Sequence, residues 1–116
     1  MSEFKIYHNP RCSKSRQTLS LLEENNVDLE IVEYLKNPPS VNELTDVIGL
    51  LELTPQQLMR KREPEYKQSG LDNTELSEST QIELMVANPK VIERPIVIGK
   101  GKAAIGRPPE NVLDIL

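Results

Sequence analysis

The sequence predicts an α/β fold in which a βαβ unit is followed by several helices and then by ββα. Three observations support this prediction. Two short apolar segments near the N-terminus flank a helix-compatible segment, residues 40–88 carry helical signals and no strand pattern, and strand signals return only after residue 95. At 116 residues the chain is long enough for one hydrophobic core. We therefore expect one domain that covers residues 1–116.

The βαβ unit is expected within the first 34 residues. The first strand is predicted from Phe4 to Tyr7, and the helix from Lys14 to about Asn25, with Leu19 and Leu22 facing inward. Residues 29–34 alternate between apolar and polar side chains, which is typical of a second strand. A strand, a helix and a strand in this order indicate a parallel pair with a right-handed crossover.

A helical insertion is expected at about residues 40–88, between the second and third strands. Ser40 and Glu43 have the spacing of a capping box, which marks the start of a helix. Thr54 gives a second, similar signal, and Ser77 begins a further helix that Asn88 and the proline after it end.

The C-terminal part predicts a hairpin and a last helix. Ile96–Ile98 is a β-branched run, and residues 99–102 form a turn of hairpin size before a strand at 103–105. Pro108 and Pro109 precede the last helix.

The composition excludes several classes of protein. A formal charge of −4 with mixed signs argues against nucleic-acid binding. No apolar stretch has the length of a membrane span, and no secretory signal follows Met1. The single cysteine cannot form an internal disulfide, so a cytoplasmic protein is expected.

Cys12 is the strongest candidate for a reactive residue. It lies between a strand and a helix, where unpaired backbone N–H groups and the helix dipole favour the thiolate. Arg11, Lys14 and Arg16 surround it in the sequence, and His8, the only histidine, lies four residues before it. Burial as a small apolar side chain is the alternative interpretation of a lone cysteine.

Spacing excludes other sites that a cysteine could serve. A two-cysteine redox motif needs a second cysteine where Ser15 stands, and a cysteine-phosphatase loop needs an arginine where Thr18 stands. One cysteine and one histidine cannot form a four-ligand zinc site, and the glycines at 99 and 101 lack the spacing of a phosphate-binding loop. We therefore expect no metal site.

The decapeptide Tyr7–Arg16 resembles the signature of the glutaredoxin-dependent arsenate reductases, a family with a thioredoxin-like fold. Three later motifs also match that family: Leu58-Met59-Arg60-Lys61, Glu93-Arg94-Pro95-Ile96 and Gly106-Arg107-Pro108. The resemblance implies a thioredoxin-like fold with the helical insertion, and an oxyanion site formed by Cys12, Arg60, Arg94 and Arg107. Guanidinium groups suit such a site because they bind tetrahedral oxyanions bidentately and keep their charge.

The resemblance also implies the reaction and supporting roles. The Cys12 thiolate would attack arsenate, and arsenite would form with glutathione and glutaredoxin as partners, without a bound cofactor or metal. His8 would lower the thiol pKa, Ser15 would donate to the thiolate or serve the first helical turn, and Asn9 would shape the loop or touch the anion. Pro95 would follow a cis peptide bond. We expect a monomer without membrane or nucleic-acid partners.

Two alternatives remain open at this stage. The chain could be a regulator related to the Spx proteins that bind RNA polymerase, although those usually carry a second cysteine where Ser15 stands. It could also be a monothiol protein that acts on glutathionylated partners, although Glu93 and Arg94 are unlike the apolar pair expected beside a glutathione site.

Overall fold

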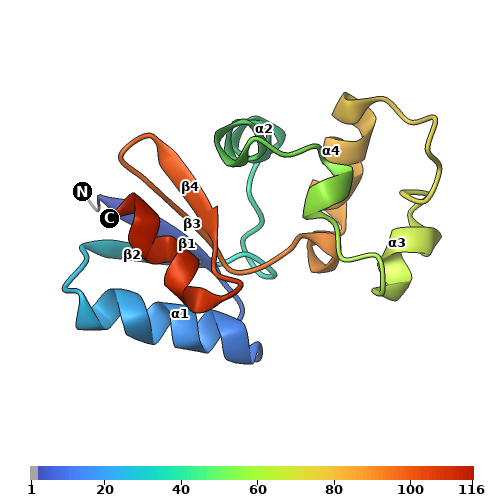
Figure 1. Ribbon diagram of the computed structural model, residues 1–116. Helices are drawn as coiled ribbons and strands as arrows, with labels where there is room; N and C mark the ends of the chain where they lie inside the picture. The colour runs from blue at the N-terminus through green and yellow to red at the C-terminus, as the bar shows by residue number, and fades with distance from the viewer. Residues whose placement is uncertain (1–2) are drawn as a thin grey trace. The chain divides into compact units, whose positions relative to one another are not determined.

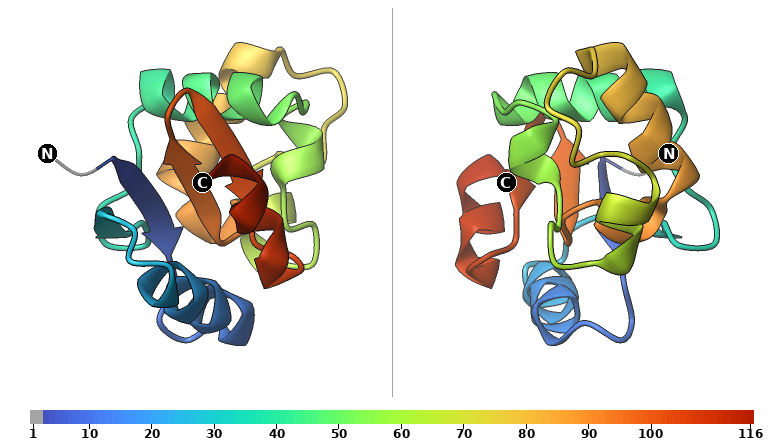
Figure 2. Two further views of the ribbon diagram at one scale, coloured as in Figure 1. Left: turned by 60° about the vertical axis from the view of Figure 1, so that its left-hand side comes forward. Right: turned by 90° about the vertical axis from the view of Figure 1, so that its right-hand side faces the viewer.

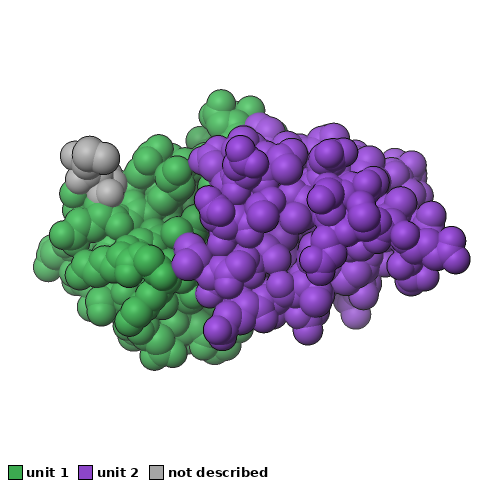
Figure 3. All heavy atoms as spheres, turned by 90° about the horizontal axis from the view of Figure 1, so that it is seen from above, with its two compact units in different colours: residues 1–37, 94–116 green, residues 38–93 purple. Residues whose placement is uncertain are grey.

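The computed structural model describes residues 3–116 and divides the chain into two compact units, which Figure 3 colours separately. Unit 1 consists of residues 1–37 and 94–116, and unit 2 of residues 38–93. The predicted insertion at about 40–88 falls inside unit 2. A single domain over 1–116 stays a prediction.

The order of elements follows the predicted βαβ, helices, ββα sequence, as Figure 1 shows. Unit 1 contains β1 (Phe4–His8), α1 (Ser13–Glu24), β2 (Leu29–Glu33), β3 (Ile96–Gly99), β4 (Lys102–Ile105) and a C-terminal 3-10 helix, η3 (Pro109–Ile115). Unit 2 contains α2 (Val41–Leu51), η1 (Gln56–Leu58), α3 (Pro64–Gln68), α4 (Glu78–Ala87) and η2 (Pro89–Val91).

Unit 1 is built on a four-stranded sheet with the strand order β2-β1-β3-β4. β1 pairs in parallel with β2 and antiparallel with β3, and β3 pairs antiparallel with β4. The central strands β1 and β3 carry buried apolar residues, including Ile6, Ile96 and Val97. The edge strand β2 is more exposed than the central strands, and its residue Ile31 is 50% exposed.

The core of unit 1 lies between the sheet and two helices. Leu22 of α1 and Val112 and Ile115 of η3 pack with Phe4, Ile6 and Val97 of the sheet in one buried cluster. Figures 1 and 2 show α1 and η3 next to each other, and residues of the two helices are in contact. This packing holds α1, whose N-cap residue is Cys12, against the sheet.

A tight turn joins β3 to β4, as predicted. Its two central residues, Lys100 and Gly101, both have positive φ angles, of 52° and 74°. A two-residue turn with this backbone matches the right-handed twist of the strands that it connects. Gly101 adopts such an angle without a steric cost.

Unit 2 is helical, and its first helix begins as predicted. The Ser40 hydroxyl accepts a hydrogen bond from the Glu43 N–H at 3.1 Å, and the Ser40 N–H donates to Glu43 Oε1 at 3.0 Å. α2 contacts α4, and both helices bury apolar residues such as Leu44 and Met85. The capping box was thus a reliable signal.

Other details differ from the predictions. The segment after Thr54 makes the expected reciprocal hydrogen bonds with Gln57 but continues only as a short 3-10 helix. α3 was not predicted, η3 has 3-10 and not α-helical geometry, and β2 ends at Glu33, one residue early. Among residues 3–116, no helix has both the length and the apolar character that a membrane span requires.

Candidate active site

Cys12 occupies the N-cap position of α1, directly after the loop that leaves β1. Its backbone is extended, with φ −95° and ψ 123°, and its thiol is partly exposed. The Cys12 N–H donates to the Asn9 carbonyl at 3.0 Å, and the Cys12 carbonyl accepts from the Arg16 N–H at the same distance. The thiol therefore lies beside the unpaired N–H groups of the first helical turn.

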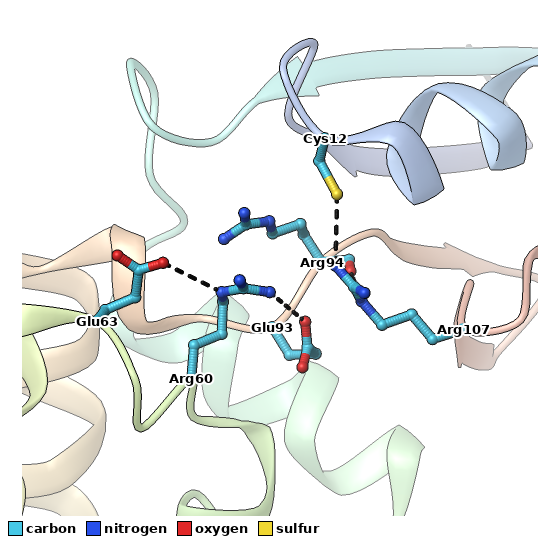
Figure 4. Close-up of polar contacts among 6 residues, drawn as sticks. All are labelled: Cys12, Arg60, Glu63, Glu93, Arg94 and Arg107. Carbon is cyan, nitrogen blue, oxygen red and sulfur yellow. Dashed lines mark hydrogen bonds and ion pairs between the residues drawn. The ribbon is translucent and has the colours of Figure 1, made fainter.

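Two arginines from the C-terminal segment of unit 1 reach the thiol. Arg107 Nη2 lies 3.4 Å from Cys12 Sγ and donates to it, and Arg107 Nε donates to the Arg94 carbonyl at 2.8 Å. The Arg94 side chain also forms a hydrogen bond with the thiol. Figure 4 shows the Arg107 contact. A sulfur atom with two guanidinium partners is an anion-stabilising environment.

The pKa of Cys12 is lowered. Burial is the largest single influence and by itself raises the pKa, but the other groups together outweigh it: the Ser15 backbone N–H donates to the sulfur, Arg94 adds a hydrogen bond and a positive charge, and Arg107 adds a second charge. Because only the thiolate is strongly nucleophilic, this environment activates Cys12.

Ser15 is fully buried and ties the loop together through its hydroxyl. Ser15 Oγ lies 2.7 Å from His8 Nδ1 and accepts a hydrogen bond from the Asn9 N–H at 3.0 Å. The Asn9 side chain accepts from the Arg11 N–H at 3.0 Å. Ser15 thus meets the thiol through its backbone N–H, while its hydroxyl and Asn9 shape the loop.

His8 is buried next to Ser15, and its pKa is lowered. Burial is the largest cause, Glu33 raises the pKa through its negative charge, and Arg16 lowers it through its positive charge. The imidazole is therefore neutral at pH 7. Among the described residues, the groups that lower the thiol pKa are Ser15, Arg94 and Arg107, and a charged His8 is not one of them.

The segment that carries Arg94 and Arg107 has the cis Arg94–Pro95 bond that the resemblance implied, and the Arg107–Pro108 bond is also cis. The Gly106 N–H donates to the Pro95 carbonyl at 3.0 Å, and the Thr18 hydroxyl of α1 approaches the Gly106 carbonyl at 3.4 Å. A Cβ at Gly106 would collide with Thr18 and would lie 2.8 Å from Pro95. Gly106 therefore allows α1 and the Arg107 segment to lie close together.

Arg60 belongs to unit 2, and its contacts there are well defined. Its guanidinium lies 3.1 Å from Glu93 and 3.5 Å from Glu63, as Figure 4 shows. The Arg60 N–H donates to the Val91 carbonyl, and the Glu93 N–H donates to the Leu58 carbonyl at 2.8 Å. Backbone pairing on both sides thus fixes the position of Arg60 within unit 2.

Three residues outside the predicted set of site residues also have roles near the thiol. Arg16 donates through Nη1 to the Pro10 carbonyl at 2.9 Å and so holds the loop before Cys12. Thr18 and Gly106 form the contact described above. The sequence had placed Arg16 among the charged residues around Cys12, but it gave no signal for the contact between Thr18 and Gly106, which are distant in sequence.

No group of three or more His, Cys, Asp or Glu side chains within residues 3–116 is arranged to hold a metal ion.

Comparison with known proteins identifies the family. The model of the ArsC family matches residues 7–115. The chain belongs to the ArsC family. It is 52% identical to the uncharacterized protein YfgD of Escherichia coli K12 over 115 residues. This alignment covers 98% of this chain and 97% of YfgD. It is 47% identical over 117 residues to the arsenate reductase of Neisseria meningitidis serogroup A, with both chains fully covered.

A solved structure supports the same assignment of the fold. The arsenate reductase from Vibrio cholerae superimposes with a TM-score of 0.93 at 45% identity, over 99% of this chain and 98% of that one. The ArsC chain described here therefore has the predicted thioredoxin-like fold, with its helical residues inserted between β2 and β3 in the sequence.

Proposed function

We propose that this chain is an arsenate reductase in which the Cys12 thiolate attacks the arsenic atom. The observation that carries the proposal is the environment of the Cys12 sulfur, which lies 3.4 Å from Arg107 Nη2, contacts Arg94 and has a lowered pKa. Arsenate is a tetrahedral oxyanion, and two guanidinium groups beside the nucleophile neutralise its charge and orient it. The curated ArsC relatives at 47% identity bear the name arsenate reductase.

The reaction proceeds in steps whose atoms and electrons balance. The Cys12 sulfur forms a bond to arsenic(V), and one oxygen of arsenate leaves as water. A glutathione thiol then attacks the Cys12 sulfur, and the electron pair of the sulfur–arsenic bond stays on arsenic, which leaves as arsenite. The mixed disulfide on Cys12 is finally reduced by glutaredoxin with a second glutathione.

External thiols follow from the cysteine count. Cys12 is the only cysteine in the sequence, so the second sulfur cannot come from this chain. We propose glutathione as co-substrate, glutaredoxin as protein partner, and a cytoplasmic monomer that needs no metal or other bound cofactor. The reducing cytoplasm supplies glutathione in this scheme.

The remaining site residues take supporting roles. His8, Asn9 and Ser15 hold the loop that presents Cys12, through the hydrogen bonds described above. Pro95 orders the segment that carries Arg94. Arg60 is included as a substrate-binding residue because its motif resembles that of the family.

A coupled assay tests the proposed activity. NADPH consumption is measured with arsenate, glutathione, glutaredoxin and glutathione reductase. We expect arsenate-dependent turnover in the wild type and none in Cys12→Ser, because serine forms no sulfur–arsenic bond. Ser13→Ala, an exposed change beside the site, serves as the matched control. Retained turnover in Cys12→Ser would overturn the mechanism.

The arginines are tested in the same assay. Arg60→Ala, Arg94→Ala and Arg107→Ala are each expected to lower kcat/KM for arsenate by about tenfold or more, since a charge-assisted hydrogen bond contributes roughly 1.5–3 kcal/mol. Lysine at the same positions is expected to restore only part of the lost kcat/KM, because an ammonium group lacks the planar fork of a guanidinium. An alanine variant with full activity removes that arginine from the proposed site.

A further inference from the structure

A cavity lies in unit 1 between the loop that precedes Cys12 and the turn after β2. It has a volume of about 220 Å³ and is lined by residues 8–11 and by Glu33, Leu35 and Lys36. β1 and β2 are parallel, and His8 pairs with Glu33 at their carboxyl ends. Ligands of parallel sheets bind outside the carboxyl ends of the strands, which is where this cavity lies.

The cavity has a rigid floor and charged walls. His8 and Asn9 are buried, and the Asn9 and Ser15 hydrogen bonds described above fix the loop. The turn after β2 is fixed by the Lys36 and Asn37 N–H groups, which both donate to the Glu33 carbonyl at 3.0 Å. Arg11 and Lys36 supply two positive charges, and Glu33 supplies one negative charge.

These charges match one end of glutathione. Its γ-glutamyl end carries an ammonium and a carboxylate on the same carbon, so it needs an acidic and a basic partner close together. Glu33 and Lys36 provide such a pair. Their charged groups form an ion pair at 3.7 Å, which the ligand would open, and the Glu33 and Lys36 side chains are 43% and 77% exposed. The cavity is smaller than typical sites for whole drug-sized ligands, which agrees with binding of one end of the tripeptide.

The position of the cavity also suits the chemistry. Arg11, in its wall, directly precedes Cys12, and adjacent Cα atoms are only about 3.8 Å apart. The Cys12 sulfur is not part of the lining, so a glutathione whose γ-glutamyl end lies in the cavity would have to extend past Arg11 to bring its own thiol to that sulfur. We propose that this cavity binds the γ-glutamyl end of glutathione, an inference that rests on the proposed arsenate reduction.

The test measures the first glutathione step alone. Cys12 is loaded with arsenate, glutathione is varied without glutaredoxin, and arsenite release is followed in a single turnover. Lys36→Ala and Glu33→Gln are expected to raise the half-saturating glutathione concentration by about three- to tenfold, the size expected for partly solvated charge contacts. Lys102 is an exposed lysine of β4, so Lys102→Ala is the control for the lost charge. It should leave the half-saturating glutathione concentration unchanged.

Truncated thiols identify the end that binds. With γ-glutamylcysteine, Lys36→Ala should still raise the half-saturating thiol concentration. With cysteinylglycine, which lacks the γ-glutamyl end, Lys36→Ala should leave that concentration unchanged. Lys36 is 77% exposed, so its removal does not endanger the fold. An unchanged glutathione dependence in Lys36→Ala would overturn the inference while leaving arsenate reduction intact.

A binding measurement separates the two proposals. S-methylglutathione, which cannot react, is titrated into the wild type, and backbone amide shifts are followed by NMR. We expect shifts at residues 9–11 and 33–36 that Lys36→Ala weakens. Shifts confined to other residues overturn the assignment of the cavity. If, separately, no thiol supports arsenite release, the proposed function fails.

Discussion

At the scale of single residues, the reactivity of Cys12 results from opposing influences on its pKa. Burial by itself disfavours the thiolate, and the Ser15 N–H, Arg94 and Arg107 together reverse that effect. Part of the stabilisation thus comes from α1, whose position the sequence predicted. The rest comes from residues more than 80 positions away, whose approach depends on the sheet.

The first prediction concerns the Cys12 pKa. The rate of iodoacetamide alkylation against pH should give a midpoint below the ordinary cysteine value of about 8.5, because the folded protein stabilises the thiolate. Arg107→Ala should raise this midpoint, since it removes a hydrogen bond and a charge at 3.4 Å from the sulfur. Because Cys12 is the only cysteine, the measurement reports this site alone.

Arg62→Ala is the control for that measurement, because Arg62 is an exposed residue of unit 2. Its midpoint should equal that of the wild type. If Arg107→Ala and Arg62→Ala both leave the midpoint unchanged, the contact between Arg107 and Cys12 does not activate the thiol.

The sequence identified several residues that surround the thiol, but it did not show what each of them does there. The loop with His8, Asn9, Cys12 and Ser15 was identified from its turn signal and its single cysteine. The direction of each side chain could not be read from it, because that depends on burial. Ser15 turned its hydroxyl toward His8, and His8 became a neutral buried group.

At the scale of elements, α1 and the segment before Arg107 approach closely at one glycine. Gly106 is buried and faces Thr18, whose hydroxyl also donates to the Lys14 carbonyl at 2.8 Å. This contact sets the distance between the start of α1 and Arg107. Sequence patterns do not reveal such a contact, because its partners are 88 positions apart.

The second prediction is that Gly106→Ala destabilises the protein by about 1–3 kcal/mol, the usual cost of overpacking. The added Cβ would collide with Thr18 and lie 2.8 Å from Pro95. Urea unfolding gives the free energy, and the alkylation profile should also shift, because Arg107 moves relative to the sulfur.

Gly49→Ala is the matched control for this substitution. Gly49 lies inside α2, and a Cβ there would meet nothing within 4 Å. Alanine favours a helix interior by roughly 0.5–1 kcal/mol over glycine, so this variant should gain stability. Equal effects of the two substitutions would contradict the tight contact at Gly106.

Element boundaries were predictable where a local signal existed. The capping box at Ser40 and the turn at Gly101 are such signals, and both were correct. η1 and η3 have the length and composition of short helices, but their 3-10 geometry depends on tertiary packing. α3 has only five residues, too few to give a periodic pattern.

At the scale of the whole molecule, the lowered pKa of His8 makes part of the stability depend on pH. The folded pKa of His8 lies below its ordinary value, so on acidification the unfolded chain binds a proton before the folded protein does. The free energy of unfolding should therefore fall as pH drops through about 6.5, the unfolded pKa of histidine.

The third prediction compares wild type with His8→Asn, which keeps a polar group near Ser15. Urea unfolding at pH 7.5 and 5.5 should show a larger loss of stability in the wild type, since asparagine does not titrate. Carboxylates contribute to both proteins alike. An equal loss in the two proteins would show that His8 is not the buried neutral group described above.

Unit 1 is assembled from two stretches of chain that residues 38–93 separate. During synthesis on the ribosome β1 and β2 emerge early, but β1 lacks its antiparallel neighbour until β3 has been translated. Unit 2 is continuous and is fully translated before that point. The nascent protein therefore carries an unfinished sheet through the synthesis of the entire insertion, in which Phe4 and Ile6 lack Val97, Val112 and Ile115 of their final core. Throughout this interval neither Arg94 nor Arg107 has been made, so the Cys12 thiol lacks both guanidinium groups that lie beside it in the folded protein.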